Sequence, residues 1–251
     1  LDLRRNIAYV ISRSQKKVTL KELQSLIGKL KFACRAVVPG RPFLRRLIDS
    51  TCGLKLPRHR RRVTEGMVAD LRVWETFLSH NNGVSLFLPH TWEDNDTLHL
   101  YTDAAGSSGF GAFFAGHWVC GVWPTEMRVT TKHITFLELF PIVLAIILWG
   151  EQLCNRKLLL RCDNQAVVDI ISRQTSRDQP CMSLVRELVL RCLQHNILIK
   201  ARHIPGVDNT IADALSRLQV PLFRKLAPTA DATMTPIPTV AWELLRQKPT
   251  D

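Results

Sequence analysis

Four acidic residues lie where a charged side chain is costly unless something compensates for it. Asp103 ends an apolar strand in LHLYTDAAGSSGFGAFF, and Glu138 lies within the apolar segment ITFLELFPIVLAIILW. Asp163 follows the strand-like KLLLRC, and Asp213 lies in HIPGVDNTIADALSR. An uncompensated carboxylate in apolar surroundings is unfavourable. Because hard divalent cations prefer oxygen ligands, the four acids predict a metal site suited to phosphodiester hydrolysis.

Each acid also has a simpler explanation. Asp103 could form a buried salt bridge or a strand-end turn. Glu138 and Asp213 each follow a threonine by three residues, which is the spacing of a capping box. Asp163 could be the N-cap of a following helix. A capping role explains one acid at a time. A shared metal site explains all four, because a bound cation would relieve the repulsion among the carboxylates.

The elements around these acids alternate between strand and helix patterns. Three glycine-separated strands predict an antiparallel meander, and longer apolar and amphipathic segments predict helices. The expected order is strands at 98–104, 109–116 and 117–124, a helix at about 135–153, a strand at 157–163, helices at about 164–172 and 182–196, a strand at 197–204, and a helix at 209–218. This order predicts an α/β fold with a mixed five-stranded sheet flanked by helices.

The first 80 residues differ from the rest in charge. They contain 18 Lys and Arg against 6 Asp and Glu, whereas residues 81–251 contain 16 of each. This asymmetry predicts a polyanion partner, most often nucleic acid, with a solvated helical surface as the alternative. Thr19 followed by Glu22 predicts a capping box that opens one helix, and 65–80 has a second helical pattern. The segment PRHRRR (57–62) also fits a nuclear import signal.

Four segments are therefore expected: a small basic helical subdomain (1–80), a linker (81–96), the α/β domain (97–218) and a proline-rich, extended tail (219–251).

The seven cysteines contain no CxxC pair, which fits a reducing compartment. No signal peptide opens the chain, and the longest apolar run is too short to span a bilayer. We expect an intracellular protein, cytoplasmic or nuclear, without a membrane partner. The initial Leu1 indicates a piece of a longer polypeptide.

The motifs YTDAAG, CDNQAVV and HIPGVDNTIADALSR, with the helix that carries Glu138, resemble the ribonuclease H domain of a retroelement reverse transcriptase. The likeness extends over roughly residues 95–218. The basic leader and the tail FRKLAPTADATMTPIPTVAWELL are similar to DIRS-type retrotransposons. The resemblance implies an RNase H fold and an endonuclease that cleaves the RNA strand of RNA–DNA hybrids. The leader would correspond to the thumb or connection region, and the polymerase part of the polyprotein, with its Tyr-x-Asp-Asp turn, is missing.

The resemblance also implies roles for individual residues. Asp103, Glu138, Asp163 and Asp213 would hold two Mg²⁺ ions, which Mn²⁺ can replace. His203 would help proton transfer or product release, although strand-end packing or a substrate contact are open alternatives. Candidate substrate contacts are Gly106, Ser107, Ser108, Asn164 and Gln165, of which Asn164 and Gln165 could instead be helix caps.

Two other functions are compatible with these motifs. A non-catalytic RNase H-fold module could tether nucleic acid or a partner, and a structural subunit could dock on a separate polymerase chain. The presence of all four acids favours the enzyme over the tethering module.

Overall fold

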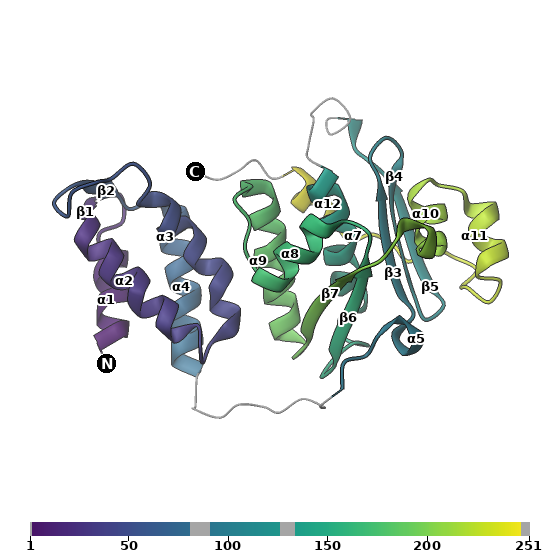
Figure 1. Cartoon of the computed structure of the whole chain (residues 1–251), viewed down its shortest axis with the longest axis horizontal. Coiled ribbons are helices and arrows are strands. Elements are labelled where there is room, and N and C mark those ends of the chain that lie inside the picture. Colours follow the sequence, from purple (N-terminus) through teal and green to yellow (C-terminus); the bar gives the residue numbers. More distant parts are fainter. Residues whose placement is uncertain (1, 81–90, 126–133, 247–251) are drawn as a thin grey trace. The chain divides into compact units, whose positions relative to one another are not determined.

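The computed structural model describes residues 2–80, 91–125 and 134–246 (Figure 1). The chain divides into two compact units, with the division between Leu86 and Phe87. This division falls inside the segment expected to be a linker, most of which lies outside the described residues. The four segment boundaries expected from the sequence stay predictions. Among the described residues, no helix is long and apolar enough to cross a membrane.

Unit 1 is a helical unit that carries one short two-stranded ribbon. Helix α1 packs against both α2 and α4, and the apolar stripe of α2 is buried. The predicted capping box is confirmed, because the side chains of Thr19 and Glu22 each bond the backbone of the other. The ribbon was not expected from the sequence. The elements are α1 (Asp2–Ser12), β1 (Lys17–Thr19), α2 (Leu20–Ala33), η1 (Val38–Leu44), α3 (Arg45–Ser50), β2 (Arg60–Arg62) and α4 (Glu65–His80).

Unit 2 is a mixed α/β unit. After the short helix α5 (Asn95–Leu98), three strands form the expected antiparallel meander, and two later strands pair in parallel. The meander strands are β3 (Leu100–Ala105), β4 (Gly109–Phe114) and β5 (His117–Val122), and the parallel strands are β6 (Lys157–Cys162) and β7 (Leu198–His203).

The single five-stranded sheet that the sequence predicts is not seen, because hydrogen bonding divides the strands into sheets of three and two. Strands β3 and β6 are neighbours, but Glu93 occupies the β6 edge opposite β7. The Glu93 N–H donates to Lys157 O, and the Leu159 N–H donates to Glu93 O. The connecting segment thus takes backbone bonds that a β3–β6 ladder would need.

Helices cover both faces of this strand array (Figure 1). Helix α7 (Ile134–Trp149) packs on β3 and β4, while α8 (Gln165–Arg173) and α9 (Gln179–Gln194) lie on the same side. After the turn η2 (Gly206–Asp208), helix α10 (Thr210–Ser216) packs on the opposite face of β3 and β4. Helix α7 continues through Pro141, and most of its residues are buried. An acidic side chain in such a helix therefore stands in apolar surroundings.

The segment expected to be an extended tail contains two helices, α11 (Val220–Leu226) and α12 (Thr239–Arg246). Phe223 is fully buried, and its ring centroid lies 5.2 Å from that of Trp118. Trp242 packs edge-on against Phe110 at 6.0 Å. The proline content predicted an extended tail, and this prediction is wrong because aromatic side chains pack the segment against β4 and β5.

Gly111 of β4 allows α10 to approach the sheet. A Cβ at this position would lie 2.3 Å from the Cβ of Leu215 and 2.9 Å from the Ser216 nitrogen. We predict that Gly111→Ala lowers the free energy of unfolding by roughly 1–3 kcal/mol, because α10 must move to relieve the overlap. Chemical denaturation measures this change. Gly28→Ala in α2, where nothing lies within 4 Å, is the control and should not destabilise the protein; equal losses would contradict the prediction.

Candidate metal centre

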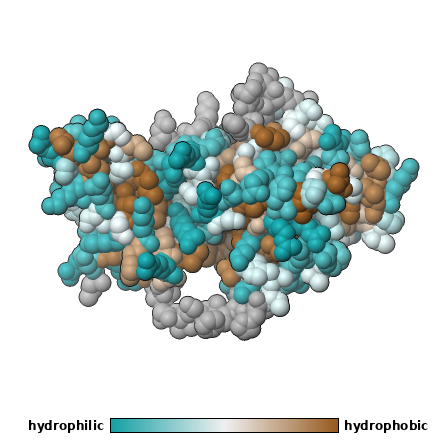
Figure 2. Space-filling model, viewed as in Figure 1, coloured by the Kyte–Doolittle hydropathy of each residue, from teal (hydrophilic) through white to brown (hydrophobic). Residues whose placement is uncertain are grey.

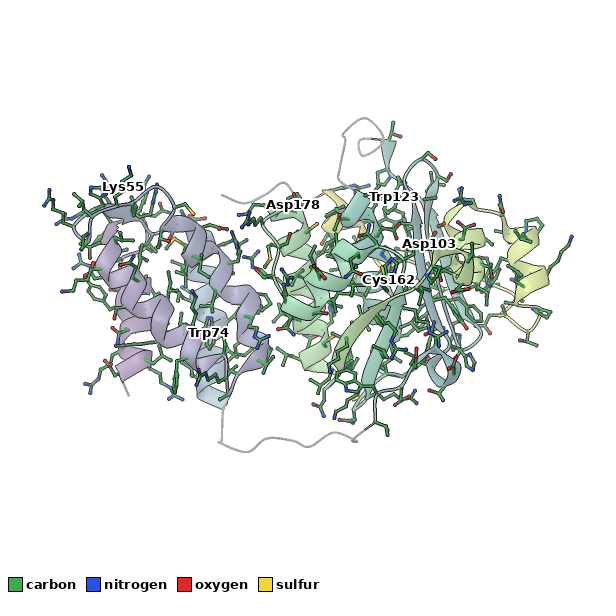
Figure 3. The ribbon with its side chains drawn as sticks, viewed as in Figure 1. Lys55, Trp74, Asp103, Trp123, Cys162 and Asp178 are labelled. Carbon is green, nitrogen blue, oxygen red and sulfur yellow. The ribbon has the colours of Figure 1, made fainter. Side chains whose placement is uncertain are left out.

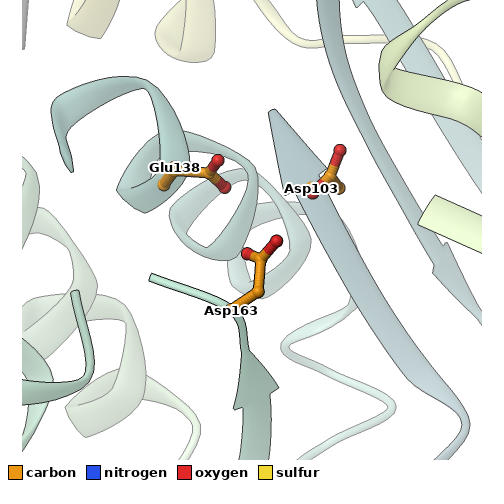
Figure 4. A group of neighbouring side chains, drawn as sticks. All are labelled: Asp103, Glu138 and Asp163. Carbon is orange, nitrogen blue, oxygen red and sulfur yellow. The ribbon is translucent and has the colours of Figure 1, made fainter. Parts of the chain in front are cut away.

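Three of the four predicted acids meet in one place. Asp103, Glu138 and Asp163 each offer an oxygen atom, and these atoms lie within 4.8 Å of one another. Figure 4 shows the three carboxylates arriving from a strand, a helix and the loop after a strand. Asp103 and Glu138 are 35 residues apart in sequence, and Glu138 and Asp163 are 25 apart. The packing of α7 and β6 beside β3 brings the three side chains together.

Asp103 is held inside the structure by β3 and α10. It lies opposite Gly111 in the meander and is 7 % exposed. The fully buried Ser216 hydroxyl donates to Asp103 Oδ2 over 2.5 Å, and its oxygen also lies 3.0 Å from the Asp213 carbonyl oxygen. This serine links the carboxylate to α10. The buried salt bridge considered for Asp103 is not present among the described residues.

Glu138 and Asp163 are not helix caps. Helix α7 begins at Ile134, so Glu138 lies in its second turn and is only 9 % exposed. Asp163 lies in the bend after β6, and the cap of α8 is its neighbour Asn164, whose side chain accepts from the N–H groups of two residues in the first turn. Capping therefore does not account for either acid.

The site strongly disfavours negative charge in the absence of a cation. Burial, and after it the charges of Asp103 and Asp163, raise the pKa of Glu138 to about 9, although a hydrogen bond from the Ala104 backbone acts in the opposite direction. Burial likewise raises the pKa of Asp103 to about 6, despite the hydrogen bond from Ser216. No ion pair to these three carboxylates occurs in the described part of the chain. A nearby cation would supply the missing compensation.

The donor set fits a hard divalent cation. Three carboxylates give only oxygen ligands, which Mg²⁺ and Mn²⁺ accept. Cys162 adjoins Asp163, but burial raises its pKa to about 12, so it stays a neutral thiol at ordinary pH. The centre therefore does not resemble a thiolate site for zinc.

Asp213 lies close to this group without joining it. Its charge raises the pKa of Asp103, which places it within electrostatic reach. However, Asp213 Oδ1 accepts from Arg217 Nε over 2.7 Å, one turn further along the helix. The capping box considered for Asp213 is absent, since Asn209 precedes α10 without a side-chain cap.

His203 and the expected substrate contacts lie around the acids. His203 ends β7, is exposed, and its Nε2 lies 3.0 Å from the Asp163 carbonyl oxygen. The turn between β3 and β4 carries Gly106 and Ser107, both exposed, and Ser108, which is partly buried. Asn164 is used as a helix cap, and Gln165 donates to Asp169 Oδ1 over 3.0 Å. The cap uses only the Oδ1 atom of Asn164, so the substrate contacts expected at Asn164 and Gln165 stay predictions.

Comparisons with known proteins give no match by sequence and a low structural likeness. No protein family matches the sequence, and no curated protein does. Among solved structures, the chain is similar to RNase H1 from the halophilic archaeon Halobacterium salinarum, with a TM-score of 0.36 and 15 % identity over 48 % of this chain and 95 % of that one. A TM-score of 0.36 assigns neither a fold nor an activity to this chain.

Two residues that support the site were not expected from the sequence. Ser216 binds Asp103, and its position one helical turn after Asp213 is the signal that could have revealed it. Gly206 approaches Asp163 so closely that a Cβ there would lie 3.1 Å from Asp163 Oδ2. Any side chain at Gly206 would therefore press on the carboxylate.

Arg217 should weaken cation binding in the isolated protein. It holds the Asp213 carboxylate and places positive charge near Asp103. We predict that Arg217→Ala raises Mn²⁺ affinity roughly two- to fivefold, as measured by calorimetric titration. Arg173→Ala breaks a similar pair with Asp169 on α8 and should leave the affinity unchanged. Weaker Mn²⁺ binding by Arg217→Ala would contradict this role.

Proposed function

We propose that this chain is a metal-dependent ribonuclease H that cleaves the RNA strand of RNA–DNA hybrids, inside the cell, as part of a retroelement reverse transcriptase polyprotein. The convergence of Asp103, Glu138 and Asp163 within 4.8 Å carries the proposal. These are three of the four acids that the sequence resemblance selects, in the same chain order. The burial of Asp103 and Glu138 without an ion-pair partner is costly for folding, and it is accounted for if the three acids hold cations.

The proposed roles of the residues follow from their contacts. Asp103, Glu138 and Asp163 would hold two Mg²⁺ ions, with Asp213 joining them once it leaves Arg217. When bound, the two ions activate water on one side of the phosphorus and stabilise charge on the leaving oxygen. Ser216 keeps the Asp103 carboxylate oriented, and the Ala104 backbone does the same for Glu138.

Selection of RNA would come from the turn that follows Asp103. Gly106 and Ser107 are exposed, and a Cβ at Gly106 would make only ordinary contacts, 3.7 Å from Ile134 Cδ1 and 3.9 Å from Leu137 Cδ1. Backbone groups there could bind a 2′-hydroxyl, which is the group that distinguishes RNA from DNA. His203, exposed beside Asp163, is proposed to assist proton transfer or product release.

The test is cleavage of an RNA–DNA duplex labelled on the RNA strand by the purified full chain. We expect cleavage with Mg²⁺ or Mn²⁺, none with a chelator, and none of a DNA–DNA duplex of the same sequence. Binding of the hybrid without cleavage under both metals would overturn the nuclease and favour a tethering module instead.

A further inference from the structure

Two short strands of unit 1 concentrate positive charge on one exposed face. Strands β1 and β2 lie 40 or more residues apart in sequence and pair antiparallel, with Lys17 opposite Arg62 and Thr19 opposite Arg60. Side chains alternate between the two faces of such a ribbon. Val18 is 2 % exposed and points to the core. The outer face therefore carries Lys17, Arg60 and Arg62, all of which are exposed.

This arrangement works against folding. Like charges directly opposite each other across an antiparallel pair are destabilising, and Lys17 and Arg62 are such a pair. Lys21 lies in the first turn of α2, where a cation opposes the helix dipole. Neither placement is explained by the stability of unit 1, and both bring positive charge to the same end of it.

Among the described residues of this unit, no ion pair joins an acidic side chain to these charges. Glu22 is beside the ribbon, but its carboxylate accepts from Thr19 and from the Tyr9 hydroxyl. In the described part of the chain, no ion pair involves any member of a group that we call the basic ribbon: Lys16, Lys17, Lys21, Arg58, Arg60 and Arg62. Figure 3 shows nitrogen-tipped side chains projecting around this end of unit 1, near the labelled Lys55, and Figure 2 shows a largely hydrophilic surface there.

We propose that the basic ribbon binds the phosphate backbone of a nucleic acid duplex without reading its sequence. Guanidinium and ammonium groups match phosphate oxygens, and phosphate contacts carry no sequence information. Docking on an anionic membrane would call for a face of several apolar anchors beside the cations; the outer face of β1 and β2 has none, and Leu56, two residues before Arg58, is a single exposed apolar side chain. The inference goes beyond the proposed nuclease, because it requires binding alone.

The test compares two variants that lose the same charge from unit 1. Lys17→Gln with Arg60→Gln removes two members of the basic ribbon, and Arg5→Gln with Lys31→Gln removes two exposed cations elsewhere in α1 and α2. Binding of the full chain to a fluorescent RNA–DNA duplex is measured in chelator over a range of salt concentrations. Chelator stops metal-dependent cleavage, so the result is independent of whether the chain is a nuclease.

We expect the ribbon variant to lose about tenfold in affinity for the duplex at 0.1 M salt for each phosphate contact removed. The slope of log binding constant against log salt concentration should become shallower by about two. The control variant should change little in either measurement. The melting temperature of the ribbon variant should stay equal or rise, since a repulsion is removed; should the double variant not fold, Lys17→Gln alone must still lose about tenfold. Equal losses from both variants would overturn the proposal. Tighter binding to anionic vesicles than to the duplex, lost in the same variant, would overturn it in favour of a membrane.

Discussion

Replacing Asp103 by asparagine should reduce cleavage of the RNA strand by at least about a thousandfold, which corresponds to roughly 4 kcal/mol of activation free energy. Asp103 is one of the three converging carboxylates and is held in place by Ser216. An amide keeps its size and can still accept from the Ser216 hydroxyl, but it loses the charge that would bind a cation. Initial rates on the labelled hybrid measure the effect.

The matched control for Asp103→Asn is Glu151→Gln. Glu151 is an exposed acid just after α7 and is not one of the converging carboxylates. This variant should cleave at the rate of the unmodified chain. Both variants should bind the hybrid similarly in chelator. Normal cleavage by Asp103→Asn would show that the acids have been assigned to the wrong role.

Glu138→Gln should stabilise the metal-free protein and remove its stabilisation by Mg²⁺. Glu138 is 9 % exposed, and burial raises its pKa to about 9 from the usual 4.5. At pH 8 the unfolded chain is ionised at this position, whereas folding must bury a charge or bind a proton. We expect Glu138→Gln to raise the free energy of unfolding at pH 8, without metal, by roughly 1–3 kcal/mol. Urea denaturation followed by circular dichroism measures this.

The pH dependence has a definite sign. A carboxyl group whose pKa is higher in the folded state makes that state bind more protons than the unfolded chain between the two pKa values. For Glu138, the free energy of unfolding of the metal-free protein should therefore fall as pH rises from 4.5 to about 9. Asp103 should contribute in the same direction from 3.8 to about 6. The advantage of Glu138→Gln should shrink at pH 5, and an equal advantage at both pH values would contradict the burial of an ionisable Glu138.

Much of unit 2 could be predicted because its local patterns agree with its tertiary structure. Glycines separate the strands of the meander, and the helix that carries Asp213 begins at Thr210, one residue from the expected start. Of the four acids, Asp103, Glu138 and Asp163 are brought together by the packing of their elements. The resemblance of the motifs selected these acids before any spatial information was available.

The remainder depends on contacts that no local pattern encodes. The bonds of Glu93 to β6 divide the expected sheet, yet Glu93 lies in a connecting segment without strand character. The three-residue strands of the basic ribbon are too short to show an alternating pattern. Arg217 bonds Asp213 because helical geometry places residues four apart on the same side, but the sequence does not show that this side faces the site. In the tail, Phe223 and Trp242 find aromatic partners that a proline-rich composition hides.

Anomalous diffraction from crystals of the full chain soaked in Mn²⁺ should locate the cations held by Asp103, Glu138 and Asp163. We expect an anomalous peak about 2.0–2.2 Å from an oxygen of each of the three carboxylates, absent from crystals of Asp103→Asn. Manganese bound only elsewhere on the protein, with these three carboxylates free of metal, would show that they do not form a metal centre.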